Sequence, residues 1–136
     1  MLENYTSFSK FTREELFSLL KFCGKKLLRR GEILFYENDP GNSMYIVERG
    51  VIKISKIGFL GETVLAQANP GDFVGEMAVV EGNLRSAAAS AMSDAELLEL
   101  TRDKFEELKQ KYPVVAVKLM DIILKLLSAR LRATTK

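Results

Sequence analysis

Between Lys25 and Leu100 the sequence consists of short β-branched or aromatic runs separated by turn residues, and this alternation constrains the fold more than any other feature. Each run has the length of a strand, and the segments between them contain glycine, proline, asparagine and aspartate, which supply turn geometry. The pattern is typical of an all-β sandwich or barrel. Strands are predicted at residues 26–29, 33–36, 43–48, 51–57, 63–68, 86–92 and 96–100.

Helical patterns flank this β region on both sides. Thr12-Arg-Glu-Glu15 is a capping box, which predicts a helix over residues 12–23 that stops at Gly24. Helical periodicity returns after Thr101 and is interrupted at Tyr112-Pro113, so a short helix and a longer one are predicted between residues 102 and 135. At 136 residues, the chain has room for one domain, and we expect residues 1–136 to form it.

The last predicted helix has an unusually wide apolar face. Its polar residues recur at steps of three and four and leave an arc of Val115, Leu119, Ile122, Ile123, Leu126, Leu127 and Leu131. One interpretation is a helix that lies on the barrel. The other is a helix that also packs against a second copy of itself, which predicts a homodimer.

The composition removes several classes of function. Without histidine and with Cys23 as its one cysteine, the chain has no Ser-His or Cys-His pair, no internal disulfide and no histidine metal site. We therefore expect a protein that is not an enzyme, with no catalytic residues, no metal and no cofactor. The net charge of +2 implies no long-range attraction to nucleic acid.

The ends and apolar stretches of the chain bear on where it acts. The N-terminus lacks a basic start followed by an apolar run, so no secretory signal is predicted. The most apolar stretch, residues 114–127, is interrupted by Lys118, Asp121 and Lys125, which would be costly in lipid. We expect a cytoplasmic protein with no membrane partner.

One glycine-rich segment, residues 71–89, carries candidate chemistry. A helical turn after Gly75 would direct backbone amides at an anion, and the planar fork of Arg85 matches two phosphate oxygens. Glu76 accepts hydrogen bonds only, so near a sugar it selects hydroxyl donors. The competing interpretation is an ordinary salt bridge between Glu76 and Arg85 that closes a loop, and spacing alone favours it.

The same segment resembles the phosphate-binding cassette of the cyclic nucleotide-binding domain family. That cassette reads approximately Phe-Gly-Glu-Leu-Ala-Leu, a short loop, and Pro-Arg-Ala/Ser/Thr-Ala; this chain has Val74-Gly-Glu-Met-Ala-Val79 and Leu84-Arg-Ser-Ala87. Turns around residues 33–41, 44–50 and 69–72 also match in order. The resemblance implies a mainly β fold with flanking helices: a double-stranded β-helix, or jelly-roll-like β-roll, with an N-terminal helix and a long C-terminal helix.

The resemblance also implies roles for individual residues of the site. Glu76 would hold the ribose 2′-hydroxyl and Arg85 the cyclic phosphate, and members of the catabolite activator type carry serine where Ser86 stands and bind cAMP. Thr134 and Thr135 match a pair that contacts the base across a dimer, although Arg130 and Arg132 nearby also suit a helix C-terminus. The expected ligand-binding residues are Gly75, Glu76, Met77, Ala78, Arg85, Ser86, Ala87, Thr134 and Thr135.

Three functions remain open at this point. The leading one is a sensor or regulatory domain that binds cAMP in preference to cGMP and couples binding to the position of the C-terminal helix. The second is the ligand-binding part of a transcription regulator, which would read DNA through a helix-turn-helix that is not found before Lys136. The third is a degenerate roll that serves for dimerisation. No direct binding of nucleic acid by this chain is expected.

Overall fold

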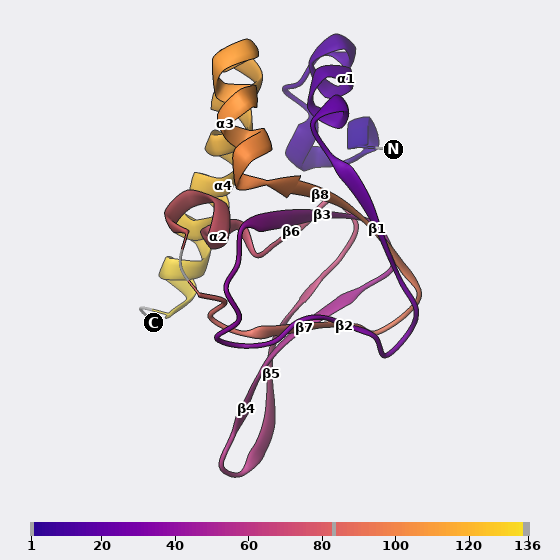
Figure 1. The fold of residues 1–136 in the computed structure, drawn as a ribbon, viewed down its shortest axis with the longest axis vertical. Helices are drawn as coiled ribbons and strands as arrows, with labels where there is room; N and C mark the ends of the chain where they lie inside the picture. Colours follow the sequence, from indigo (N-terminus) through magenta and orange to yellow (C-terminus); the bar gives the residue numbers. More distant parts are fainter. Residues whose placement is uncertain (1, 83, 135–136) are drawn as a thin grey trace.

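The computed structural model describes residues 2–82 and 84–134, and it confirms a mainly β fold with helices at both ends (Figure 1). Two antiparallel four-stranded sheets have the orders β1-β8-β3-β6 and β2-β7-β4-β5. The strands are β1 (Gly24–Leu28), β2 (Ile33–Phe35), β3 (Ser43–Arg49), β4 (Ile52–Gly58), β5 (Gly61–Ala68), β6 (Phe73–Val74), β7 (Ala88–Ala91) and β8 (Ala95–Thr101).

The helices lie mostly against the first sheet, whereas the β4–β5 hairpin projects from the opposite end of the molecule (Figure 1). They are the 3-10 helices η1 (Leu2–Asn4) and η2 (Thr6–Phe8), and the α-helices α1 (Arg13–Lys21), α2 (Glu76–Glu81), α3 (Arg102–Lys111) and α4 (Pro113–Thr134). Within the described part of the chain, no helix combines the length and apolarity that a bilayer crossing requires.

The predicted start of the first helix is confirmed, but its predicted end is wrong. Thr12 and Glu15 exchange both hydrogen bonds of the capping box, at 3.1 and 2.8 Å. The helix ends at Lys21. The backbone of its C-cap, Phe22, is still in the right-handed helical conformation, and the Phe22 N–H donates to carbonyls of the last turn. Gly24 opens β1 and pairs with Glu99, so it extends the sheet instead of stopping the helix.

The shortest elements were not predicted from the sequence. The helices η1 and η2 and the strand β6 have only two or three residues each, which is too few for a periodic signal. The strand predicted at 86–92 is also shorter than expected, since β7 covers only Ala88–Ala91. Residues 86 and 87 form a bend before it.

The first sheet has an apolar core on each of its faces. Side chains alternate along a strand, so Met44 and Ile46 of β3 pack under the helices while Tyr45 and Val47 face the interior of the roll. The outer core contains aromatic side chains of the N-terminal segment, α3 and β6. The inner core is lined by small residues such as Ala89 and leaves the interior narrow.

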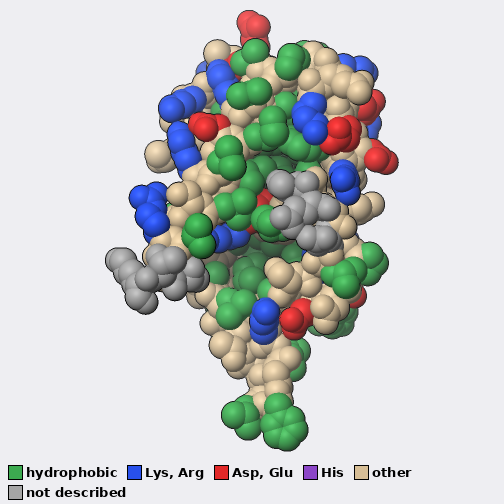
Figure 2. Space-filling model, turned by 90° about the vertical axis from the view of Figure 1, so that its left-hand side faces the viewer, with side chains coloured by type: hydrophobic (Ala, Val, Ile, Leu, Met, Phe, Trp, Pro, Cys, Tyr) green, Lys and Arg blue, Asp and Glu red, His purple; other side chains and the backbone are tan. Residues whose placement is uncertain are grey.

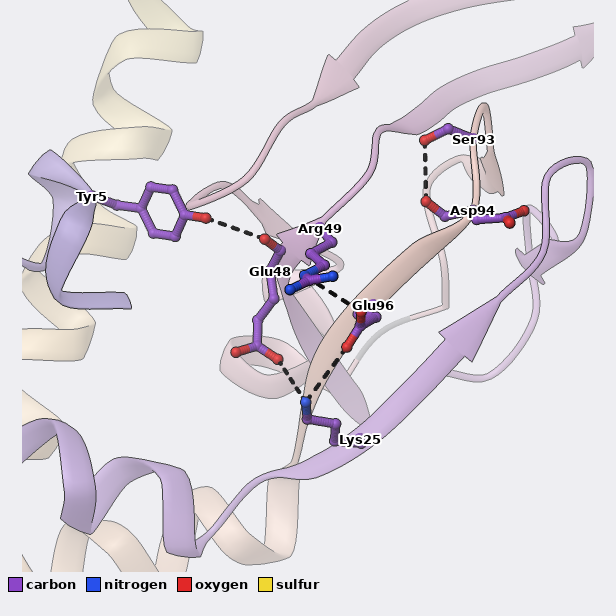
Figure 3. Close-up of polar contacts among 7 residues, drawn as sticks. All are labelled: Tyr5, Lys25, Glu48, Arg49, Ser93, Asp94 and Glu96. Carbon is purple, nitrogen blue, oxygen red and sulfur yellow. Dashed lines mark hydrogen bonds and ion pairs between the residues drawn. The ribbon is translucent and has the colours of Figure 1, made fainter. Parts of the chain in front are cut away.

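One hydrogen bond joins the N-terminal segment to β3, and three ion pairs link β1, β3 and β8 within the first sheet (Figure 3). The Tyr5 hydroxyl donates to the Glu48 carbonyl at 3.1 Å. The Lys25 ammonium lies 3.5 Å from the Glu48 carboxylate and 3.6 Å from that of Glu96, which also pairs with Arg49. Because the Lys25 and Arg49 side chains are more than half exposed, these ion pairs add little to the stability of the sheet.

The Cys23 thiol is expected to be unreactive in the folded protein. Burial, with a smaller contribution from the Glu48 carboxylate, raises the pKa of this thiol from 9.0 to about 12. Alkylation requires the thiolate, whose population at pH 8 falls as the pKa rises. Alkylation of Cys23 by iodoacetamide should therefore be roughly a hundredfold or more slower in buffer than in urea. Equal rates in the two solvents would contradict this environment.

Candidate functional site

The predicted helical turn in the glycine-rich segment is present as α2, between β6 and the loop that leads to β7. Gly75 precedes it in the left-handed conformation, with φ of +74°, and Gly82 caps its other end. The Ala78 N–H donates to the Gly75 carbonyl at 3.2 Å. This sharp turn into α2 directs the Glu76 side chain inward, where it is buried.

The backbone of Arg85 is fixed against the turn between β2 and β3. Its N–H donates to the Asp39 carbonyl, and its own carbonyl accepts from the Asn38 N–H, both at 2.8 Å. Asn38 has a positive φ of 71°, which an asparagine tolerates. Two segments far apart in the sequence thereby meet, and Arg85 enters the roll at their junction.

The Arg85 guanidinium lies in a tight, partly aromatic seat. Its central carbon is 4.1 Å from the centre of the Phe35 ring, and its Nη1 donates to the Gly75 carbonyl at 3.2 Å. A Cβ at Gly41 would lie 2.6 Å from the Arg85 Nε, and a Cβ at Gly75 would collide with Nη1. Glycine is needed at both positions because the guanidinium passes directly over the backbone.

The burial and charge of the Arg85 guanidinium suit the binding of an anion. Arg85 is only 7% exposed, and its buried Nε–H has no hydrogen-bond partner among the described residues. Burial lowers the pKa of the guanidinium, an effect opposed by Tyr45, Asp39 and Glu99. Among the side chains that the structure describes, no carboxylate pairs directly with Arg85. A buried cation with an unused donor is the arrangement that binds a phosphate.

Glu76 is paired, but not with Arg85. Its carboxylate is 3% exposed and forms an ion pair with Arg130, which comes from α4 and is about half exposed. The loop salt bridge that spacing alone favoured is therefore not formed among the described residues. The sequence analysis considered Arg130 only as a complement to the helix dipole, because nothing in its position along the chain signals contact with residue 76.

The remaining predicted residues lie at different depths. Ala78 and Ala87 are buried beside the two charged side chains, Met77 is half-buried, and Ser86 is exposed. Thr134 is the last residue of α4, but its side chain and the whole of Thr135 lie outside the described residues. Contact of these residues with a ligand stays a prediction.

The sequence analysis missed the groups that orient Arg85. Phe35 and Tyr45 lie on β2 and β3, more than 35 residues before Arg85, and the alternation of their strands signals only that they face inward. Gly41 looked like an ordinary turn residue. These residues surround the Arg85 cation, which suits an anion, while the buried Glu76 carboxylate suits hydroxyl donors.

A second hollow lies away from these residues. It has a volume of about 340 Å³ and lies between the N-terminal segment, the turn before β6, and α4. Two of its lysines, Lys118 and Lys125, are paired with Glu15 and Asp121, and the third, Lys10, is exposed. Among its described residues, the hollow therefore has no buried cation with an unused donor like that of Arg85.

Comparisons with known proteins agree with this geometry. Residues 25–112 match the family model described as the cyclic nucleotide-binding domain. The chain is 35% identical over 120 residues to the Cyclic AMP receptor protein of Thermus thermophilus, an alignment that covers 88% of this chain and 54% of that protein. The chain therefore belongs to the cyclic nucleotide-binding domain family.

Solved structures give the same result. The crystal structure of Thermus thermophilus catabolite activator protein aligns with a TM-score of 0.83 and 33% identity over 95% of this chain and 59% of that one. A cyclic nucleotide-binding domain from Methylobacillus flagellatus aligns with a TM-score of 0.86 and 27% identity, covering 97% of this chain and 75% of that one. This chain thus spans a little over half the length of its Thermus relative.

Proposed function

We propose that this chain is a sensor domain that binds a cyclic nucleotide, with the phosphate on Arg85 and the ribose hydroxyl on Glu76. The observation that carries the proposal is the buried Arg85 Nε–H, which has no partner among the described residues, on a side chain that donates to the residue before the buried Glu76. One phosphodiester anion would satisfy that donor and offset the desolvation of the guanidinium. In this role the chain binds its ligand and performs no reaction on it.

We further propose cAMP as the preferred ligand over cGMP. The support is the name of the Thermus relative, a cyclic AMP receptor protein, together with a serine at position 86. The test is calorimetry of the purified chain with each nucleotide. We expect saturable binding of both with cAMP the tighter, and absence of binding with either nucleotide would contradict the function itself.

The contact between Glu76 and Arg130 supports a route from the site to α4. A ribose hydroxyl that donates to Glu76 shares the carboxylate with Arg130 or displaces it, so ligand binding changes what holds this end of α4. The helix position is then the output of the domain. Hydrogen exchange of residues 124–134 should change when cAMP is added, and an unchanged exchange pattern would contradict the coupling.

We also propose a homodimer through α4, although on another face than the predicted apolar arc, since Val115, Leu119 and Ile123 of that arc are buried in the outer core. Val117 and Leu124 are seven residues apart and 59% and 65% exposed, and the half-buried Met120 and Leu127 lie between and beyond them. This is the a and d spacing of a two-stranded coiled coil. Figure 2 shows apolar side chains gathered along the middle of the face on which α2 and α4 lie.

If α4 forms this dimer seam, one charge placed in the seam should strongly weaken dimerisation. Leu124→Glu should convert the dimer to a monomer, because two buried carboxylates would face each other across the axis. Light scattering after size-exclusion chromatography measures the mass directly. Ala129→Glu, on the exposed outer side of the same helix, is the matched control and should stay dimeric. A monomeric wild-type chain would contradict the interface.

A second candidate function is the ligand-binding part of a transcription regulator of the catabolite activator type. It is favoured by one observation, the coverage of only 54% of the Thermus relative by nearly the whole of this chain. Both candidates use the same site and the same helix. They differ in whether a DNA-binding segment comes after α4 in the natural protein, which sequencing of the complete transcript would decide.

A further inference from the structure

Tyr45 forms a second wall of the seat in which Arg85 lies. Its side chain faces the interior of the roll from the middle of β3 and is 6% exposed. The Arg85 guanidinium carbon is 6.0 Å from the centre of the Tyr45 ring, and the Tyr45 and Phe35 rings are 6.4 Å apart. The guanidinium is thus flanked by two aromatic rings, whose electron-rich faces attract a cation.

The far end of the Tyr45 ring is anchored by hydrogen bonds. Its hydroxyl donates to the Glu99 Oε2 at 2.9 Å, and the Ser43 hydroxyl donates to the same oxygen at 3.0 Å. Tyr45 and Glu99 are direct cross-strand partners in β3 and β8, and Ser43 is two residues along the same face. These three side chains form what we call the Tyr45 anchor.

The anchor keeps its hydrogen-bonding state across the neutral pH range. Burial is the main cause that raises the pKa of the Tyr45 phenol, so the hydroxyl stays protonated and donates to Glu99. A buried phenol that loses its acceptor costs free energy. The ring therefore has one favoured orientation, set by Glu99 at its far end and by Phe35 and Arg85 at its side.

Glu99 also acts on Arg85 without occupying any of its donors. Its charge raises the pKa of the guanidinium, in opposition to burial, yet it forms no ion pair with it among the described residues. A directly paired carboxylate would compete with an incoming phosphate for the same N–H groups. Because the Tyr45 ring lies between the Glu99 carboxylate and Arg85, the Arg85 Nε–H remains available to an anion.

We propose that Tyr45 is a positioning residue for Arg85: its ring, fixed by Glu99 and Ser43, holds the guanidinium in the orientation that receives an anion. The inference rests on the proposed function, since the anion is the phosphate of the cyclic nucleotide. It goes beyond that function by assigning a role to a polar cluster of the roll interior.

The first test needs no nucleotide. In ¹⁵N-labelled protein the Arg85 Nε–H signal is assigned by its loss in Arg85→Lys, and its exchange with water is measured. Tyr45→Phe, which removes only the hydroxyl, should raise the exchange rate by about fivefold or more. Tyr5→Phe is the matched control. It also removes one tyrosyl hydrogen bond, the one from Tyr5 of the N-terminal segment to the Glu48 carbonyl (Figure 3). It should leave the signal unchanged.

The second test links the anchor to binding. Calorimetry with cAMP should show that Tyr45→Phe weakens affinity by about fivefold to tenfold, the effect of one neutral hydrogen bond. Glu99→Gln keeps an acceptor for Tyr45 and should retain affinity within about twofold, whereas Glu99→Ala should lose as much as Tyr45→Phe. In an Arg85→Gln background, Tyr45→Phe should change the residual affinity less than about twofold.

The outcomes separate the two proposals. Wild-type exchange and affinity in Tyr45→Phe would overturn the positioning role, and so would an equal loss of affinity in the Arg85→Gln background. A wild-type protein that binds neither nucleotide would overturn the proposed function. The exchange measurement would still decide whether Tyr45 holds Arg85.

Discussion

Replacing Arg85 with alanine should weaken binding of cAMP by roughly 2 kcal/mol or more, about thirtyfold in the dissociation constant. The side chain supplies the buried cation of the site, and its Nε–H is the donor without a partner. Alanine leaves the backbone hydrogen bonds to Asn38 and Asp39 in place, so the loop keeps its course. Calorimetry of the wild type and the variant gives the comparison directly.

Two further variants make this result specific. Arg85→Lys keeps a charge but loses the planar fork, and its affinity should fall between those of the wild type and Arg85→Ala. Arg13→Ala removes an exposed arginine at the start of α1 and should bind like the wild type. An Arg85→Ala protein that is folded by circular dichroism and binds cAMP with wild-type affinity would disprove the assignment of the phosphate site.

Replacing Glu76 with alanine should remove most of the preference for a ribose over a deoxyribose. The buried carboxylate accepts hydrogen bonds only, so it favours a ligand that donates a 2′-hydroxyl. We expect the wild type to bind cAMP at least about tenfold more tightly than 2′-deoxy-cAMP, and Glu76→Ala, which has no side-chain acceptor, to bind the two within about threefold. Calorimetry with both ligands measures each ratio.

The 2′-deoxy ligand is itself the internal control for this prediction. A variant that merely loosened the fold would weaken both ligands alike and leave the ratio unchanged, which is the outcome that contradicts a ribose contact. Glu106→Gln, at an exposed ion pair of α3, should keep both affinities and their ratio. Arg130 is about half exposed, so water solvates it when Glu76 loses its charge.

The local sequence specified most of the individual elements. The capping box at Thr12 and the turn residues between the strands act over a few positions, and the helix starting at Pro113 needs only its own periodicity. The helical turn after Gly75 was foreseen for the same reason. The shortest elements, η1, η2 and β6, were missed because packing against the rest of the fold stabilises them and their own pattern is too brief.

The candidate site was foreseen in its charges but not in its partners. The residue pattern and the family resemblance together predicted Glu76 and Arg85 as the ligand-binding polar groups of the cassette. The pairing of Arg130 with Glu76 could not be predicted from the sequence, because 54 residues separate them along the chain. Nor did the sequence indicate that Phe35 and Tyr45 flank Arg85.

Local sequence thus dictated which side chains carry charge in the cassette, where the turns fall and which helix has an apolar face. Those properties depend on neighbours within one turn or one strand. Long-range packing dictated that Arg85 is buried with no direct counter-ion among the described side chains, that Glu76 pairs with Arg130 of α4, and that Tyr45 donates to Glu99. These contacts depend on strand register and on the path of α4, which arise only when the two sheets close around their interior.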